Sequence, residues 1–318
     1  MAPKDVVLAR TAAKWEVDMK ALEVKPQVAL KNILFATDFE VSASRALPFA
    51  VALADRYDAK LYAAHVIPPE AYAFASPGSI DRVLREAGDF AGYTLNQTVN
   101  SLRCRGLLCE ALLGEGNVAE VLERWVQTCS ADLVVVGTIS RAGWGKVVLG
   151  SVAEQVIRKT PCPVLTVGPH VITLASAGVH SIVCATDFSR VSRRAVELAL
   201  SLACEYEAHL TLIHVREGSL RNSPQFAVQV DENRLREMIP PLPELFYRPE
   251  VVVETGAVAE RILKIAVDLS ADLIVMGVRG VGALAQTASH FGSIAHRVVT
   301  LAPCPVVTVG DGQTTEED

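Results

Sequence analysis

The sequence has no apolar run approaching the roughly 18 residues that a membrane-spanning helix requires. Residues 1–20 carry scattered charges and lack the apolar core of a signal peptide. Basic residues are not in excess: the formal net charge is -6, which argues against nucleic acid as the main partner. We therefore expect a cytoplasmic protein that engages neither a membrane nor nucleic acid.

Cysteine pairs and familiar catalytic signatures are also missing. The 7 cysteines include no CxxC pair and are expected to be reduced and buried, although the spacing of Cys104 and Cys109 leaves a redox or metal role open. There is no P-loop, and the GxGxxG fingerprint fails because Val148 follows Gly143 and Gly145 where the third glycine should stand. We can assemble neither a nucleophile–base–acid set nor a metal-binding array, so we expect no catalytic and no metal residues.

What the sequence does contain is an internal repeat. KNILFATDFEVSASRAL in the first half matches HSIVCATDFSRVSRRAV in the second. SADLVVVG likewise recurs as SADLIVMG, and TPCPVLTVG recurs as APCPVVTVG. A chain of 318 residues, half of them hydrophobic, has room for two domains with real cores. The repeat therefore predicts two similar domains in tandem.

Each half alternates apolar strand patterns with helical patterns, which predicts an α/β fold with a parallel sheet and helices on both faces. The expected strands are Ile33–Thr37, Leu61–Val66, Leu107–Leu113, Leu133–Gly137 and Val164–Val167, then Ile182–Thr186, Leu210–Val215, Val251–Glu254, Leu273–Gly277 and Val306–Val309. The expected divisions are an N-terminal extension (1–30), a first domain (31–168), a linker (169–179), a second domain (180–310) and a polar tail (311–318). The helix-like stretch in residues 1–30 either docks on the body or frays. We further expect Pro163–Val167 to pair with Pro305–Val309, since the edges of these apolar strands would otherwise be exposed.

One stretch points to a ligand. The buried strand ending at Gly137 is followed by a glycine-containing loop, and Gly150-Ser151 then opens a helix. This arrangement exposes backbone N–H groups to a phosphate. The second half repeats it with Gly277, Gly292 and Ser293. An ordinary turn with a helix cap is the alternative, but a cap does not need a repeated glycine loop.

Ligands of doubly wound sheets bind beyond the carboxyl ends of the strands. The acids that follow the first strand of each half, Asp38 and Asp187, would accept a hydrogen bond from a ribose hydroxyl or a metal-bound water. Both also suit an N-cap of the next helix, and the two interpretations are compatible. His65 and His214 near the end of the second strand are more typical of satisfied core groups than of ligands.

Taken together, these motifs resemble those of a known protein family. ATDF after the first strand, a glycine loop with a nine-residue gap before G-[ST], and a closing PCPVL strand resemble the universal stress protein family. The resemblance covers residues 31–310, so the chain looks like two such domains in tandem. It implies Rossmann-like domains of the adenine nucleotide alpha hydrolase type, each with a five-stranded parallel sheet. Many members bind ATP or AMP, while others bind no nucleotide. The ligand expected for this chain is ATP or AMP, with or without Mg2+.

The resemblance also implies the site residues. In the first half they are Ala36 and Asp38 at the nucleoside, Val66 at the adenine, and Gly137, Ser140, Arg141, Gly143, Gly150, Ser151 and Val152 around the phosphates. In the second half they are Ala185, Asp187, Val215, Gly277, Gly280, Gly292 and Ser293. A ligand phosphate also needs positive charge nearby, which Arg141 and Lys146 would supply in the first half and Arg279 in the second.

Each half departs from the family pattern once. Ser140 stands where the second glycine is expected, although the gap of nine residues to Gly150 is kept. In the second half the gap between Gly280 and Gly292 is eleven residues, two too many. Phosphate binding requires several backbone N–H groups to point at the same place. Two extra residues in the loop of the second half should therefore weaken binding more than Ser140 does in the first half. We expect the first half to bind the nucleotide more tightly.

The sequence thus predicts a stress-response protein that binds an adenine nucleotide in at least one half and has a regulatory rather than a catalytic role. ATP hydrolysis is expected to be slow or absent. The alternative is a nucleotide-free pseudo-dimer that serves as a scaffold for partner proteins, and a homodimer also stays open. A nucleotidyl-transfer enzyme is disfavoured because neither an SGGxD-like loop nor an HxGH tetrad occurs.

Overall fold

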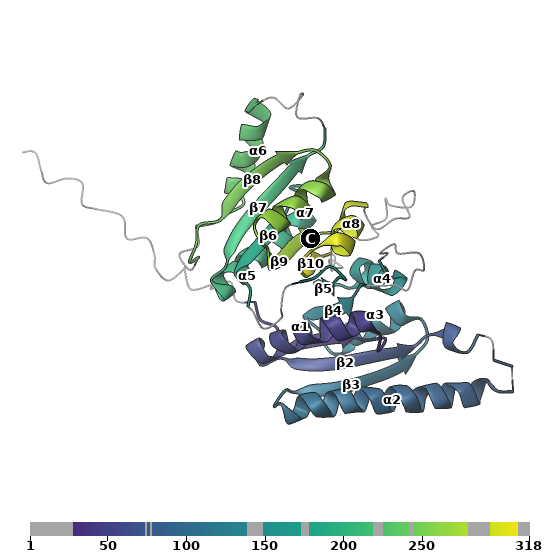
Figure 1. The fold of residues 1–318 in the computed structure, drawn as a ribbon. Helices are drawn as coiled ribbons and strands as arrows, with labels where there is room; N and C mark the ends of the chain where they lie inside the picture. The colour runs from purple at the N-terminus through teal and green to yellow at the C-terminus, as the bar shows by residue number, and fades with distance from the viewer. Residues whose placement is uncertain are drawn as a thin grey trace, which may run out of the picture.

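Ten strands form one continuous sheet in the computed structural model of the chain (Figure 1). Their order across the sheet is β3-β2-β1-β4-β5-β10-β9-β6-β7-β8. The structure describes residues 28–73, 75–76, 78–138, 149–172, 178–218, 225–241, 245–278 and 293–310.

The first half contributes five strands and four α-helices. In chain order these are β1 (Asn32–Ala36), α1 (Val41–Tyr57), β2 (Lys60–Ile67), a short 3-10 helix η2 (Pro69–Ala71), α2 (Ile80–Cys104), β3 (Cys109–Glu115), α3 (Val118–Thr128), β4 (Leu133–Gly137), α4 (Ser151–Lys159) and β5 (Val164–Val167).

In its described residues the second half repeats this order of strands and α-helices. It comprises β6 (Ser181–Ala185), α5 (Arg190–Tyr206), β7 (His209–Arg216), α6 (Gln225–Glu237), β8 (Glu250–Thr255), α7 (Val258–Asp268), β9 (Leu273–Gly277), α8 (Ser293–Leu301) and β10 (Val306–Val309). The predicted α/β fold is confirmed, with strand boundaries shifted by two residues at most.

Within each half all strand pairs are parallel, and the two halves join through one antiparallel pair. Leu165 of β5 lies opposite Val307 of β10, and Thr166 lies opposite Val306. The Thr166 hydroxyl also donates to the Val306 carbonyl at 3.0 Å. The predicted pairing of the two closing strands is therefore confirmed, and it buries both edges at the centre of the sheet.

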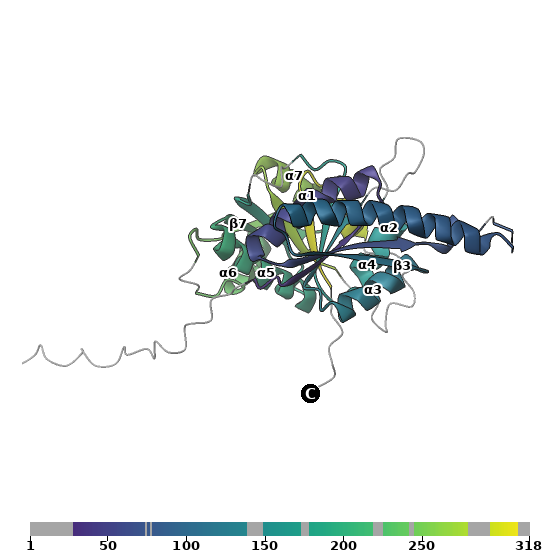
Figure 2. The same cartoon turned by 90° about the horizontal axis from the view of Figure 1, so that it is seen from below.

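Helices cover both faces of the sheet, which is why the strands are almost continuously apolar. Ile33 and Phe35 of β1 belong to the core under α1, α2, α5 and α6, while Leu34 belongs to the core under α3, α4, α7 and α8. In Figure 2, α1 and α2 lie on one side of the first-half strands and α3 and α4 on the other. Among the described residues, no helix is long and apolar enough to cross a membrane.

The repeated SADL segment has a structural role that was not predicted from the sequence. The Asp132 carboxylate accepts hydrogen bonds from the backbone N–H groups of Lys31 and Asn32, at 2.7 and 2.9 Å. Asp272 accepts the equivalent bonds from His180 and Ser181, at 2.8 and 3.0 Å. Each aspartate thus ties the start of the fourth strand of its half to the start of the first strand.

None of the seven cysteines forms a disulfide. Cys109, Cys184 and Cys304 are buried, as expected, but Cys104 is exposed at the end of α2. Burial raises the pKa of Cys162 to about 12, which keeps this thiol protonated and unreactive near neutral pH. In the described part of the chain no group of three or more histidine, cysteine or acidic side chains is arranged to hold a metal ion.

Candidate functional site

The first half has its topological switch point between β1 and β4. From β1 the chain adds β2 and then β3 on one side, whereas β4 and β5 lie on the other side. Ala36 at the end of β1 is in register with Val136, one residue before the end of β4. In such sheets the crevice beyond these two carboxyl ends is where ligands bind. The second half has the same arrangement at β6 and β9, where Ala185 is in register with Met276.

The start of α4 is held directly at this edge. The Gly150 N–H donates to the carbonyl of Thr138, the residue after β4, at 3.2 Å. Gly150 is the N-cap of α4, with φ -63° and ψ 140°, and it makes no side-chain cap bond. Ser151 is the first helical residue and not the cap. Gly150 and not Ser151 is therefore the cap, and the N-cap supplies no side chain to the first-turn N–H groups of α4.

Gly137 and Gly277, at the ends of β4 and β9, are required by packing. A Cβ added at Gly137 would stand 2.5 Å from the backbone carbon and oxygen of Ser42, at the start of α1. The equivalent atom at Gly277 would stand 2.8 Å from the backbone nitrogen of Ser192. Real Cβ atoms essentially never come so close to backbone. A ligand is therefore not needed to explain these two glycines.

Asp38 stabilises a turn and does not cap the helix. Its Oδ1 atom accepts the backbone N–H of Glu40 at 2.9 Å, and Glu40 is the N-cap of α1. In the second half Asp187 accepts the N–H of Ser189 at 3.0 Å, and Ser189 is the N-cap of α5. The N-cap interpretation of both acids is therefore wrong. The Asp38 residue is exposed beside the carboxyl end of β1, where it is accessible to a ligand.

A phenylalanine and a histidine brace the same turn in both halves. Phe39 adopts φ 62°, a left-handed conformation that is unfavourable for a bulky residue, and its ring stacks on His65 with centroids 4.3 Å apart. His65 Nδ1 lies 2.8 Å from the Thr37 carbonyl. Phe188 (φ 64°) and His214 repeat this, with ring centroids 4.4 Å apart. The histidines are thus satisfied structural groups, as favoured from sequence, whereas the role of the phenylalanines was missed although ATDF occurs in both halves.

Burial lowers the pKa of the His65 imidazole below its ordinary value, against the opposing effects of the Thr37 carbonyl and the Asp38 carboxylate. A group whose pKa is lower in the folded state binds its proton more readily in the unfolded chain. The stability contributed by neutral His65 is therefore complete above about pH 6.5, the unfolded pKa, and is lost as the pH falls from there through the folded pKa. We expect an NMR titration to place the His65 midpoint below about 6.5, the ordinary value for histidine. A midpoint at or above that value would contradict this.

The second half has an ion cluster at the end of β7. Asp231 of α6, whose side chain is 6% exposed, pairs with Arg216 of β7, and Arg234 Nη1 lies 3.5 Å from its other carboxylate oxygen. The Arg234 guanidinium also lies 3.9 Å from the centre of the Phe188 ring. The position equivalent to Arg216 in the first half is Ile67, an apolar residue at the end of β2. The two halves therefore differ chemically next to Val66 and Val215.

The remaining predicted site residues differ in burial, and some lie outside the described residues. Val66 and Val215 are buried near the ends of the second strands, while Ser151 and Val152 at the start of α4 are exposed. Ser293 begins α8, as expected. Six predicted residues lie outside the described residues: Ser140, Arg141, Gly143, Arg279, Gly280 and Gly292. The structure therefore brings Ala36, Gly137, Gly150 and Ser151 to one edge of the sheet and leaves the loop between β4 and α4 undescribed.

The fold defines a doubly wound α/β protein with a topological switch point in each half. Comparison with known proteins identifies the family: the universal stress protein family matches residues 29–168 and again residues 178–310. The chain belongs to the universal stress protein family and carries two of its domains in tandem.

Individual relatives agree with this assignment. A universal stress protein of Methanocaldococcus jannaschii is 31% identical over 141 residues, which cover 43% of this chain and 81% of the relative. One from Bacillus subtilis is 30% identical over 142 residues, covering 39% of this chain and 95% of the relative. The crystal structure of a universal stress protein from Archaeoglobus fulgidus superposes with a TM-score of 0.69 at 21% identity, covering 88% of this chain and 98% of that one. This last similarity extends the shared fold over both halves.

Proposed function

We propose that this chain is a stress-response protein that binds an adenine nucleotide, ATP or AMP, at the switch point of its first half. The observation that carries the proposal is the position of the α4 N-terminus, which the bond from Gly150 to Thr138 holds at the carboxyl edge of β4. The first N–H groups of a helix carry partial positive charge, and here the N-cap supplies no side chain to satisfy them. A phosphate group is the ligand that such a helix start favours.

The proposed contacts follow the parts of the nucleotide. Val66 lies at the adenine, while Ala36 and Asp38 contact the ribose, with the Asp38 carboxylate accepting a hydroxyl or a water of bound Mg2+. The phosphates lie against Gly137 and the start of α4. The residues assigned to them are Gly137, Ser140, Arg141, Gly143, Gly150, Ser151 and Val152. Arg141, together with Lys146, supplies the positive charge that a phosphate needs.

The proposed role is regulatory rather than catalytic. His65 Nδ1 lies 2.8 Å from the Thr37 carbonyl and its ring stacks on Phe39, so this histidine supports the turn that carries Asp38. A nucleotide-free scaffold for partner proteins is the second candidate. It is favoured by the second half, where the ion cluster around Asp231 occupies the end of β7 beside Val215.

Replacing Gly150 by valine is expected to weaken nucleotide binding by about tenfold to a hundredfold, because hydrogen bonds from the helix start to a charged phosphate contribute about 1.5–3 kcal/mol each. Isothermal titration calorimetry with ATP and with AMP measures the effect, and circular dichroism checks the fold. Gly88→Ala, at an open position in α2, is the matched control and should bind like the wild type. Unchanged affinity in Gly150→Val would remove the first half as the site, while no binding by wild type supports the scaffold.

Gly292→Val tests the second half in the same way, using the residues Ala185, Asp187, Val215, Gly277, Arg279, Gly280, Gly292 and Ser293 assigned there. We expect the wild type to bind one nucleotide tightly and the Gly292→Val variant to retain that binding. Loss of binding in Gly292→Val alone would reverse the ranking of the two halves. It would also mean that Ser140 matters more than the two extra residues before Gly292.

A further inference from the structure

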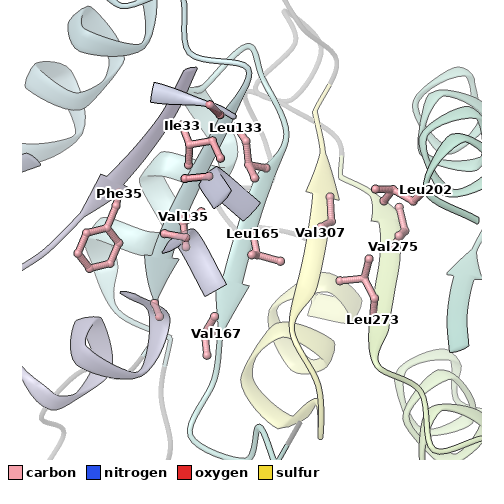
Figure 3. Close-up of a cluster of buried hydrophobic side chains, with 14 of the residues drawn as sticks. Ile33, Phe35, Leu133, Val135, Leu165, Val167, Leu202, Leu273, Val275 and Val307 are labelled. Atoms are coloured by element: carbon pink, nitrogen blue, oxygen red, sulfur yellow. The ribbon is translucent and has the colours of Figure 1, made fainter. Parts of the chain in front are cut away.

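A broad apolar groove lies between α1 and α5, over the seam where β5 pairs with β10. Its volume is about 1010 Å³. Leu165 and Val307 of the paired strands lie in its floor, and Leu47, Leu53 and Leu198 of the two helices lie in its walls. Figure 3 shows Leu165 and Val307 on adjacent strands, with Leu133 and Leu273 on the strands beyond them. We call this surface the α1–α5 groove.

The groove is separate from the nucleotide site. Asp132 and Asp272, which directly precede β4 and β9, line it, so it opens at the amino ends of these strands and not at the carboxyl ends. At one end it is bordered by the last turns of α1 and α5. There Arg56 pairs with Glu205 at 3.4 Å and lies 4.0 Å from the centre of the Tyr206 ring.

The chain enters the described structure at this groove. Val28 and Leu30, which precede β1, both line it and pack against the core beneath it. Twenty-seven residues come before Val28 in the sequence. Whatever structure these residues adopt, they are attached to the edge of the groove. A short tether of this kind gives an effective concentration on the order of millimolar, so even weak affinity suffices for occupancy.

The sequence of this segment suits an apolar groove. Five of its apolar residues recur at spacings of four, three, four and three: Leu8, Ala12, Trp15, Met19 and Leu22. Lys14, Glu16, Asp18 and Lys20 stand between them, and Pro26 follows. This spacing predicts a helix with one apolar face that ends before the proline. Residues 8–24 would make a helix of about 25 Å, the length of the 17-residue α1 beside the groove.

We propose that residues 8–24 form an amphipathic helix that docks in the α1–α5 groove of the same chain, with Trp15 and Met19 as its central anchors. A helix this short is marginal alone in water, so it depends on burying its apolar face. The apolar groove buries that face, as in other complexes where a helix docks in a groove through anchor residues spaced by three and four. The docked helix covers the seam that joins the two halves.

Hydrogen exchange of the full-length protein, read by mass spectrometry, tests the proposal. In the wild type we expect residues 8–24 to exchange at least about tenfold more slowly than an unstructured chain. Trp15→Asp should remove this protection and raise exchange in peptides of α1 and α5 that border the groove. Lys14→Asp, which places the same side chain on the polar face, should retain the protection.

Leu198→Gln tests the groove from the other side, at a half-buried residue of α5. It should also remove the protection of residues 8–24, with circular dichroism verifying that both variants are folded. Exchange at the unstructured rate in the wild type, or protection that survives both variants, overturns the proposal. If light scattering shows a dimer and the protection is found only in that dimer, the groove binds a second copy of the chain. If native mass spectrometry shows an apolar small molecule bound to the purified protein, the groove binds that molecule. Either result also overturns it.

Discussion

Replacing Gly137 by alanine is expected to lower the free energy of unfolding by about 3 kcal/mol, the upper part of the range for overpacking in a core. The added methyl group would stand 2.5 Å from the backbone carbon and oxygen of Ser42 and 2.9 Å from the nitrogen of Ala43. Because these are backbone atoms, no side chain can move aside, and α1 would have to shift away from β4. Urea denaturation followed by circular dichroism measures the change.

Gly88→Ala is the matched control for this substitution. It adds the same methyl group inside α2, at a position where the new atom meets nothing within 4 Å beyond its chain neighbours and the backbone of the helix itself. Because alanine favours a helix over glycine, we expect it to raise the free energy of unfolding by about 0.5–1 kcal/mol. Equal stabilities for the two variants would show that α1 moves away from β4 at little cost, contrary to the tight packing described above.

Replacing Leu165 by alanine is expected to cost about 3 kcal/mol, as for other large-to-small substitutions in cores. Leu165 is 4% exposed, lies opposite Val307 and belongs to a core that extends through both halves. Because one sheet and one core span the seam, the two halves should unfold together. A single transition should therefore move to lower urea concentration in the variant.

The control for the seam is Leu301→Ala, at the last residue of α8, where the side chain is 40% exposed. This substitution should change the free energy of unfolding by less than about 0.5 kcal/mol, as surface substitutions usually do. Two separate transitions in Leu165→Ala, with one of them unshifted, would contradict a single cooperative unit. Such a result would mean that the β5–β10 pair adds little to the stability of either half.

Some features of the site were accessible from sequence because they are local in the chain. The run that ends at Gly137 and the helix that follows Gly150 both appear where their apolar patterns place them. Asp38 shows the limit of such reasoning. Aspartate favours several kinds of turn and cap, and only the backbone path decides that its carboxylate accepts the N–H of Glu40 while Glu40 occupies the cap position.

The sequence by itself determined the repeat and the alternation of strands and helices, since apolar periodicity and burial act along a single segment. It also predicted that the two closing strands pair, because each has an apolar edge that would otherwise be exposed. Only the tertiary structure decided which atoms from distant segments meet. The contact between Gly137 and Ser42, and the ion pair between Arg216 and Asp231, join residues of different elements. The groove between α1 and α5 likewise exists only once both halves pack on one sheet. Close approach and charge pairing depend on distances in space, which no spacing along the chain specifies.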